Sequence, residues 1–212
     1  MLSTQGKQRF QSQKEFVRNL KAGEHGCMFF VSEEDFKNVQ FEFVKSGLEQ
    51  NWGVVCATAT EIPDQVRTRM KHYGIDVHKY ETNESLVILR GEDLYKDPEN
   101  PDLQAWTSAA RSVCEGFMAK GKRGVRIAAD LSSYFLSKGL TKQWFQLEYA
   151  LERKFATPLT VICGYDARLI PASKDLDIIE YYKLVNREQR DYVDAHSFAI
   201  YSNNNKTMIL TI

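Results

Sequence analysis

An apolar run at residues 27–31 leads directly into a segment of helical pattern at residues 35–49. A strand, turn and helix of this kind open a nucleotide-binding α/β sheet, in which a glycine-rich loop normally holds the phosphates. This turn contains neither glycine nor lysine, but Ser32 followed by the carboxylates of Glu33, Glu34 and Asp35. Three negative charges would repel a triphosphate. The sequence therefore predicts the frame of a nucleotide-binding domain without its phosphate-binding loop.

Strand-like and helical segments alternate along the rest of the chain. Further strands are expected at residues 54–58, 86–89, 125–129, 159–163, 196–201 and 207–212, and further helices at 63–73, 103–120, 141–155 and 175–192. Alternation of this kind predicts a three-layer α/β domain with a mostly parallel sheet and helices on both faces. The last two strands are joined by a short polar turn, which predicts an antiparallel pair at the C-terminal end.

The N-terminal segment has a pattern of its own. Phe10, Phe16, Val17 and Leu20 follow one another at helical spacing, and Gly23 ends the pattern. We expect a leading amphipathic helix within residues 1–22, packed on the domain or on a partner. Residues 23–212 are expected to form a single domain.

Charge and hydropathy narrow the class of partner. Of 212 residues, 28 are lysine or arginine and 28 are aspartate or glutamate, so the formal net charge is zero. Nucleic acid is not expected as a partner of such a chain, and the basic turn at residues 120–123 is read as a solvated one. No apolar run approaches the roughly 18 residues of a membrane span, and residues 1–21 do not resemble a signal peptide. We expect a cytoplasmic protein that does not bind membranes.

The four cysteines also fit that environment. Cys27, Cys56, Cys114 and Cys163 are dispersed along the chain without CxxC spacing. Three of them lie in apolar, strand-like runs, so buried, reduced thiols are the favoured interpretation.

Ligands of open α/β sheets bind outside the carboxyl ends of the strands, and this rule selects residues from four turns. The candidate ligand-binding residues are Ser32, Glu33, Thr58, Glu61, Asp130, Ser132, Tyr165, Asp166 and Arg168. Asp130 ends an apolar strand, as the carboxylate that holds Mg²⁺ through water does in a phosphate-binding ATPase. The alternatives are that Asp130 only caps the next helix, and that Asp166 only forms an Asx turn.

Two histidines form a different set. His25 precedes one strand and His196 opens another, so both are expected at the amino-terminal edge of the sheet. Cys27 and Cys163 are not expected to join them. Glu148 is a single carboxylate on the helix expected at 141–155, and the sequence does not indicate which way its side chain points. A transition-metal site needs three or four converging ligands, so structural histidines are favoured over metal ligands. No metal, no cofactor and no catalytic residue is expected.

Several of these residues, taken in order, resemble the MEDS family, the methanogen/methylotroph DcmR-type sensory domain. The resembling parts are His25 with the strand to Val31, Ser32-Glu33-Glu34, Gly74-Ile75-Asp76, Leu86 to Leu89 with Tyr95, Arg126 to Asp130, Glu148, Cys163-Gly164-Tyr165-Asp166 and Asp194-Ala195-His196. They run from about residue 23 to 200. The chain differs from the family pattern at Ser133-Tyr134, where a tryptophan would follow Ser132, and at Ser197, where a proline would stand.

The resemblance implies a degenerate RecA-like fold, similar to that of KaiC-type ATPases, with Asp130 where the Walker B aspartate would fall. It implies sensing or protein interaction rather than hydrolysis, beside partners such as a signalling kinase or a transcriptional regulator.

The leading hypothesis for function is a non-catalytic sensory or signalling domain. A small ligand or a protein partner would bind at the carboxyl edge of the sheet and favour one arrangement of the 92–102 loop or of a subunit interface. Two alternatives stay open. One is an interaction module that forms homo- or hetero-oligomers without a ligand, and the other is an atypical ATPase.

Overall fold

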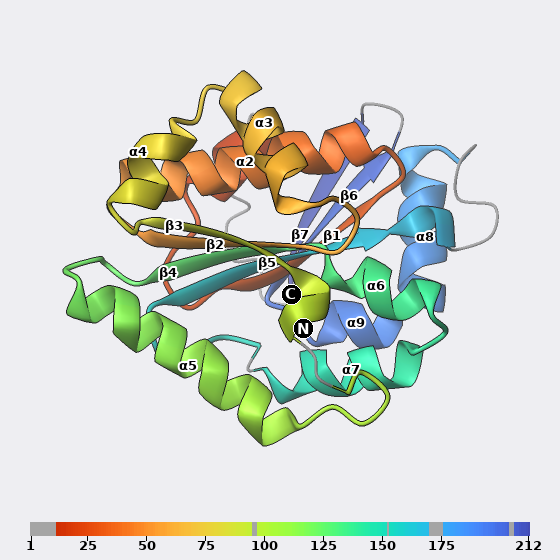
Figure 1. The fold of residues 1–212 in the computed structure, drawn as a ribbon. Coiled ribbons are helices and arrows are strands. Elements are labelled where there is room, and N and C mark those ends of the chain that lie inside the picture. Colours follow the sequence, from red (N-terminus) through yellow and green to blue (C-terminus); the bar gives the residue numbers. More distant parts are fainter. Residues whose placement is uncertain (1–11, 95–96, 152, 170–175, 204–205) are drawn as a thin grey trace.

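The computed structural model describes residues 12–94, 97–151, 153–169, 176–203 and 206–212. Within these ranges seven strands form one sheet in the order β3-β2-β4-β5-β1-β6-β7 (Figure 1). The strands are β1 (His25–Phe30), β2 (Gly53–Thr58), β3 (Leu86–Arg90), β4 (Val125–Ala129), β5 (Leu159–Asp166), β6 (Phe198–Asn203) and β7 (Lys206–Thr211). The pairs are parallel except β6 with β7, which is antiparallel. The expected mostly parallel sheet with an antiparallel C-terminal pair is confirmed.

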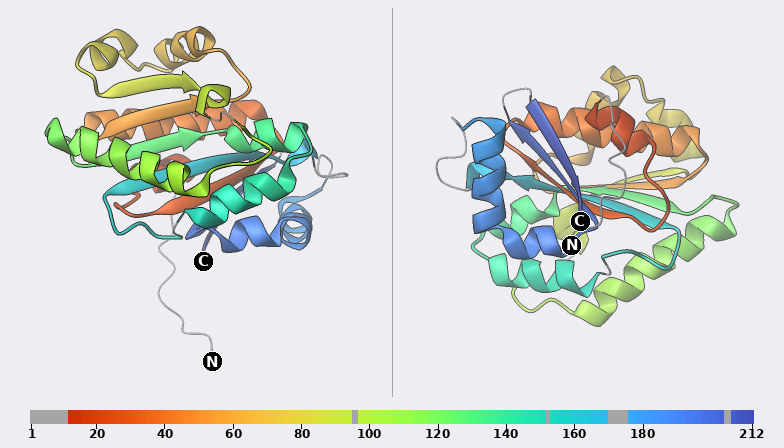
Figure 2. Two further views of the ribbon diagram at one scale, coloured as in Figure 1. Left: turned by 60° about the horizontal axis from the view of Figure 1, so that its bottom comes forward. Right: turned by 180° about the vertical axis from the view of Figure 1, so that it is seen from behind.

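Helices cover both faces of the sheet (Figures 1 and 2). One face carries α1 (Gln13–Arg18), α2 (Glu33–Glu49), α3 (Pro63–His72) and α4 (Val77–Thr82). The other carries α5 (Leu103–Ala119), α6 (Leu131–Ser137), α7 (Thr141–Ala150), α8 (Ile178–Glu188) and α9 (Arg190–Asp194). Two short 3₁₀ turns, η1 (Gly91–Leu94) and η2 (Ala167–Leu169), follow β3 and β5.

Two hydrophobic cores result, one on each face. Side chains of a strand point alternately to its two faces. In β1, Cys27 and Phe29 enter the core beneath α5 to α9, and Met28 and Phe30 enter the core beneath α1 to α4. Every residue of β1 is buried. A strand covered on both sides reads as one continuous apolar run, which is why the sequence could predict this strand from hydrophobicity alone.

Local signals fix several element ends. Ser32 accepts a hydrogen bond from the backbone N–H of Asp35 and so caps α2. Asp102 and Asp177 cap α5 and α8 in the same way. Gly74 has a φ of 88° directly after the C-cap of α3, a conformation that glycine adopts without strain. The predicted stop at Gly74 is confirmed.

The structure corrects the predicted elements in five places. In place of the helix expected at 175–192 there are two helices, α8 and α9, which meet at Gln189. Helix α4 follows α3 where only a connection to a strand was expected, and Asp76 caps it. Helix α6 follows β4 directly and was not predicted. The helix expected at 141–155 ends at Ala150, because Leu151 is already extended. The strand expected to end at Cys163 continues to Asp166, since β1 offers pairing partners over that length.

The leading helix packs on the same chain. Phe16 and Val17 of α1 are buried, and the Phe16 ring meets the Phe198 ring edge-on at 5.0 Å. Phe10 lies outside the described residues. Within the described ranges, no helix combines the length and the apolar character that crossing a membrane requires.

Candidate functional site

The carboxyl edge of the sheet, where the sequence predicted a ligand site, is occupied by a network of ion pairs. Asp130, at the end of β4, is 2% exposed. It stands at the N-cap position of α6, but its side chain makes no capping hydrogen bond there. Its carboxylate accepts hydrogen bonds from the Ala59 N–H at 2.5 Å and the Thr60 hydroxyl at 3.0 Å. Lys37 Nζ lies 3.3 Å from the same carboxylate. The interpretation of Asp130 as only a helix cap is therefore wrong.

Lys37 is the centre of this network. It lies one turn into α2, its side chain is 1% exposed, and its ammonium is 2.8 Å from Glu61 Oε2. Burial would raise the pKa of Glu61, but the Lys37 ammonium and then the Arg69 guanidinium outweigh it and lower that pKa. Burial would likewise lower the pKa of Lys37, but Asp130 and Glu61 raise it. Both groups are therefore charged at pH 7.

The acidic turn after β1 is neutralised in part by one arginine. Arg69 of α3 contacts Glu33 and Glu34, each at 3.0 Å, and Glu61 at 2.9 Å. Asp35 accepts a hydrogen bond from the Ser202 hydroxyl at 3.2 Å. The carboxylates of the turn thus have partners within the chain, which the sequence did not indicate. We call Lys37, Asp130, Glu61, Arg69 and Glu33 the carboxyl-edge network.

Four other predicted site residues have partners of their own at this edge. Ser32 caps α2, and Thr58 Oγ1 accepts from the Glu61 N–H at 3.2 Å. Asp166 accepts from the backbone N–H of Arg168 at 2.9 Å and pairs with its guanidinium, so the Asx turn is confirmed.

Ser132 and Tyr165 do not join the carboxyl-edge network. Ser132 is fully buried, and its hydroxyl donates to the Gly164 carbonyl. Tyr165 points to the opposite face from Asp166, because neighbouring strand residues alternate. Its hydroxyl donates to Glu148 Oε1 at 2.6 Å and accepts from Trp144 Nε1 at 3.1 Å. Placing Tyr165 beside Asp166 in one site was therefore wrong.

Glu148 belongs to a second group of polar residues, buried beneath α7. His25, Glu148, Cys163 and His196 each offer a ligand atom, and these atoms all lie within 4.8 Å of one another. We call these four residues the buried polar cluster. The rings of His25 and His196 are 4.2 Å apart, as expected for two histidines at the amino-terminal edge. Cys163 Sγ lies 3.8 Å from His25 Nε2, so the expectation that Cys163 stays apart is wrong.

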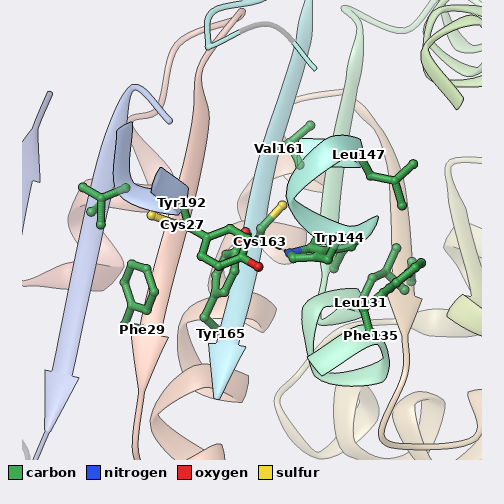
Figure 3. Close-up of a cluster of buried hydrophobic side chains, with 14 of the residues drawn as sticks. Cys27, Phe29, Leu131, Phe135, Trp144, Leu147, Val161, Cys163, Tyr165 and Tyr192 are labelled. Carbon is green, nitrogen blue, oxygen red and sulfur yellow. Dashed lines mark hydrogen bonds between the residues drawn. The ribbon is translucent and has the colours of Figure 1, made fainter. Parts of the chain in front are cut away.

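The register explains this convergence. His25 pairs with Val161 and Cys27 with Cys163, so His25 and Cys163 face the same side on adjacent strands. His196 precedes β6, the other neighbour of β1, and Glu148 comes from the helix that covers this face. Figure 3 shows Cys163, Tyr165 and Trp144 on this side of the sheet. Four segments far apart in the sequence thus contribute one side chain each.

Glu148 is the acidic group of the cluster, and its neighbours determine its pKa. Burial would raise the pKa of Glu148, but His196, His25 and the Tyr165 hydroxyl together lower it to about 2. Burial, and then the neighbouring His25, lower the pKa of His196 to about 4. Glu148 is therefore ionised while His196 stays neutral at pH 7. Burial and the charge of Glu148 raise the pKa of the Cys163 thiol, which keeps its proton.

An apolar pocket of about 350 Å³ adjoins the cluster. It lies between α5, α7 and strands β2 to β5, and we call it the α5–α7 pocket. Trp106 and Trp144 lie in its wall, and Glu148 and Cys163 are among its few polar lining residues. Its lining residues also include Val87, Leu94 and Val113, which are exposed at 40%, 42% and 38%, so the pocket reaches the surface there. Sequence reasoning missed it, because a gap between a helix and a sheet leaves no signal in residue order.

The fold and the site together define the class of protein. It is a three-layer α/β domain with a mostly parallel sheet, an apolar pocket on one face and an ion-paired carboxyl edge. The chain belongs to the MEDS family, the methanogen/methylotroph DcmR sensory domain, whose family model matches residues 24–181. It is thus a member of a family of sensory domains. No curated protein matches the sequence.

Proposed function

We propose that this chain is a non-catalytic sensory domain that binds a small, neutral and largely apolar molecule in the α5–α7 pocket. The pocket carries the proposal. Its volume of about 350 Å³ falls in the range of small-molecule sites, roughly 300–1,000 Å³, and such sites are mostly apolar with few polar groups. Glu148 at the wall disfavours an anionic ligand, since its carboxylate is ionised.

The loop that follows η1 offers a route for the signal. Leu94 lines the pocket, and residues 97–102 lead from there to the start of α5. Gln143 Nε2 of α7 donates to the Glu99 carbonyl at 3.2 Å, which links this loop to the second wall helix. A ligand between α5 and α7 would favour one arrangement of the loop, and a protein partner such as a signalling kinase or regulator would read it.

A tryptophan fluorescence titration tests the ligand site. Trp106 and Trp144 line the pocket, so binding of neutral probes such as medium-chain alcohols and alkylbenzenes should change the emission with saturation. Ala110→Trp fills the pocket from α5 and should weaken binding at least 10-fold. Ala105→Trp, at an exposed position of the same helix outside the lining, is the matched control and should bind normally. Equal binding by both variants, or no saturable binding by the natural chain, would contradict the proposal.

A degenerate RecA-like, KaiC-like origin of the fold is part of the proposal. Strand β1 lies inside the sheet between β5 and β6, Asp130 follows β4 where the resemblance would put a Walker B aspartate, and Lys37 of α2 reaches it. Lys37 also pairs with Glu61, so a triphosphate at this edge would have to displace two carboxylates from one buried lysine. This pairing supports a domain without hydrolysis.

Phosphate release assays test the alternative of an atypical ATPase. We expect no ATP turnover above that of a denatured control. Turnover that disappears in Asp130→Asn would support the ATPase alternative, and it would remove the non-catalytic part of the proposal.

Binding at the carboxyl edge is the second candidate for the sensory role. Arg168 and Glu33 lie at this edge and are about half exposed, at 46% and 42% of their side chains. A protein surface could exchange their ion pairs at low cost, because exposed pairs contribute little. If the ligand binds in the α5–α7 pocket, Arg168→Ala should leave the tryptophan titration unchanged. A weaker titration in Arg168→Ala would indicate instead that the ligand binds at the carboxyl edge.

A further inference from the structure

The buried polar cluster contains the donor atoms of a metal site. We propose that His25, Glu148, Cys163 and His196 bind one divalent transition-metal ion of the zinc type at the inner wall of the α5–α7 pocket. Histidine nitrogen, cysteine sulfur and a carboxylate oxygen are the ligands that zinc takes in proteins, in sets of four. The proposal rests on the cluster and is independent of what occupies the pocket.

Three of the six distances between the donor atoms are close to those of a tetrahedral ion. Cys163 Sγ is 3.8 Å from His25 Nε2, which is 3.3 Å from Glu148 Oε2. That oxygen lies 3.6 Å from His196 Nε2. With metal–ligand bonds of about 2.0–2.3 Å, a tetrahedral site separates its ligand atoms by about 3.3–3.6 Å. The remaining pairs of donor atoms lie within 4.8 Å, so side-chain movements of about 1 Å would complete the coordination.

Two of these donor atoms have no other hydrogen-bonding use. Glu148 Oε2 and His196 Nε2 are buried and have no hydrogen-bond partner among the residues that the structure describes. The contact between Glu148 Oε2 and His25 Nε2 has the length of an ion pair but not the geometry of a hydrogen bond. Burying a polar atom without a partner costs about 1–3 kcal/mol. Coordination to one ion would satisfy both atoms.

The surrounding hydrogen bonds hold two of the ligands, His196 and Glu148, in binding orientation. His196 Nδ1 lies 2.6 Å from the Tyr192 carbonyl, so it carries the proton and leaves the Nε2 lone pair directed into the cluster. Glu148 Oε1 accepts from Tyr165, which in turn accepts from Trp144. Backbone carbonyls that receive a histidine proton, and donors that fix a carboxylate, are the partners that metal ligands commonly have.

The charges would balance in the buried site. The Cys163 thiol loses its proton to solvent when its sulfur binds the ion, and Glu148 is already a carboxylate. Two negative ligands and two neutral imidazoles then surround a divalent cation, which leaves no net charge in the core. Because Glu148 and Cys163 also line the pocket, the ion can enter from that side. Cys27, the neighbour of Cys163 in the register, is outside the set of converging donors.

Cobalt titration of the untagged full chain, stripped with a chelator, tests the proposal. Co²⁺ should bind at one ion per chain and give the strong visible bands of a tetrahedral site and a sulfur-to-cobalt band in the near ultraviolet, and Zn²⁺ should displace it. Cys163→Ser should lose the sulfur-to-cobalt band. Tyr165→Phe, which removes only a supporting hydrogen bond, should keep the bands and bind about 10–100-fold more weakly. Circular dichroism confirms folding of each variant.

Two control variants separate this site from other metal-binding residues. Cys56→Ser removes a buried thiol on the other face of the sheet, and His72→Ala removes an exposed histidine. Both should keep the wild-type spectrum and stoichiometry. Absence of one-to-one binding by the folded natural chain would overturn the proposal, as would an unchanged spectrum in Cys163→Ser. Neither result bears on the tryptophan titration with apolar probes, so the two proposals fail separately.

Discussion

Replacing Lys37 by methionine should destabilise the domain more than any exposed ion pair could. Methionine keeps most of the side-chain volume but leaves Asp130, 2% exposed, and Glu61, 12% exposed, without their shared cation. Removing one partner of a buried ion pair costs about 3–5 kcal/mol. Asp130 keeps two hydrogen bonds and Glu61 keeps Arg69, so we expect the lower end, about 3 kcal/mol. For a domain of this size that lowers Tm by about 6–12 °C.

Thermal and urea unfolding, followed by circular dichroism, measure this loss. Lys120→Met is the matched control, because Lys120 also pairs with a glutamate, Glu84, but both side chains are exposed, at 52% and 67%. Exposed pairs contribute little, so the control should unfold close to the natural midpoint. If Lys37→Met lost no more stability than Lys120→Met, the carboxyl-edge network would not stabilise the fold and the reasoning would be refuted.

The pKa shifts of Glu61 and Lys37 predict how the stability difference between the natural chain and Lys37→Met depends on pH. The pKa of Glu61 is lowered, so its stabilising contribution is complete above its unfolded pKa of about 4.3 and is lost as the pH falls through the folded value. The pKa of Lys37 is raised, so its contribution is complete below about 10.4 and is lost as the pH rises through the folded value. The stability difference between the natural chain and Lys37→Met should be largest from about pH 5 to 10 and shrink below about pH 4.

Three further predictions concern packing, the buried hydrogen bonds and the thiols. Gly26→Ala would place a methyl group against the Phe198 ring and should destabilise by about 1–3 kcal/mol in urea unfolding, whereas Gly116→Ala, open on all sides in α5, should stabilise by about 0.5–1 kcal/mol. Equal effects would contradict the packing described. Tyr165→Phe removes a hydrogen bond to the ionised Glu148 and should cost about 1.5–3 kcal/mol, measured in metal-free buffer. All four cysteines are buried, so Ellman's reagent should label none of them in the native protein and all of them in denaturant; fast labelling of the native form would contradict their burial.

The fold was largely predictable because most of its strands, β1, β2, β4, β5 and β6, are buried along nearly their whole length. Continuous apolar runs and helix-stopping glycines such as Gly74 are local signals, and the sequence displays them directly. Helices α4 and α6 were missed since both are short and closely follow another element: α6 begins right after β4, and only residues 73–76 separate α4 from α3. Their helical state is decided by what they pack against rather than by their own pattern.

The candidate site was less predictable, because it depends on register and helix rotation. Asp130, Glu61 and Glu33 were assigned to the right edge of the sheet by the rule for strand ends. That Lys37 reaches the same edge from within a helix follows only once α2 is placed on the sheet. That His25 and Cys163 lie close together can be predicted only once β1 is known to pair with β5, and residue order does not reveal this pairing. Glu148 then completes the cluster only because α7 turns that residue inward.

The central place of β1 has a consequence for how the chain is made. Its two neighbours in the sheet are β5 at Leu159–Asp166 and β6 at Phe198–Asn203, so β1 leaves the ribosome before the other described strands but is among the last of them to be paired. Strands β2, β3 and β4 are contiguous in the sheet and can assemble beforehand. Until then an apolar strand stays exposed on both edges, as a substrate for chaperones and a template for aggregation. A chain cut before residue 159 would keep three paired strands and leave β1 with no neighbour at all.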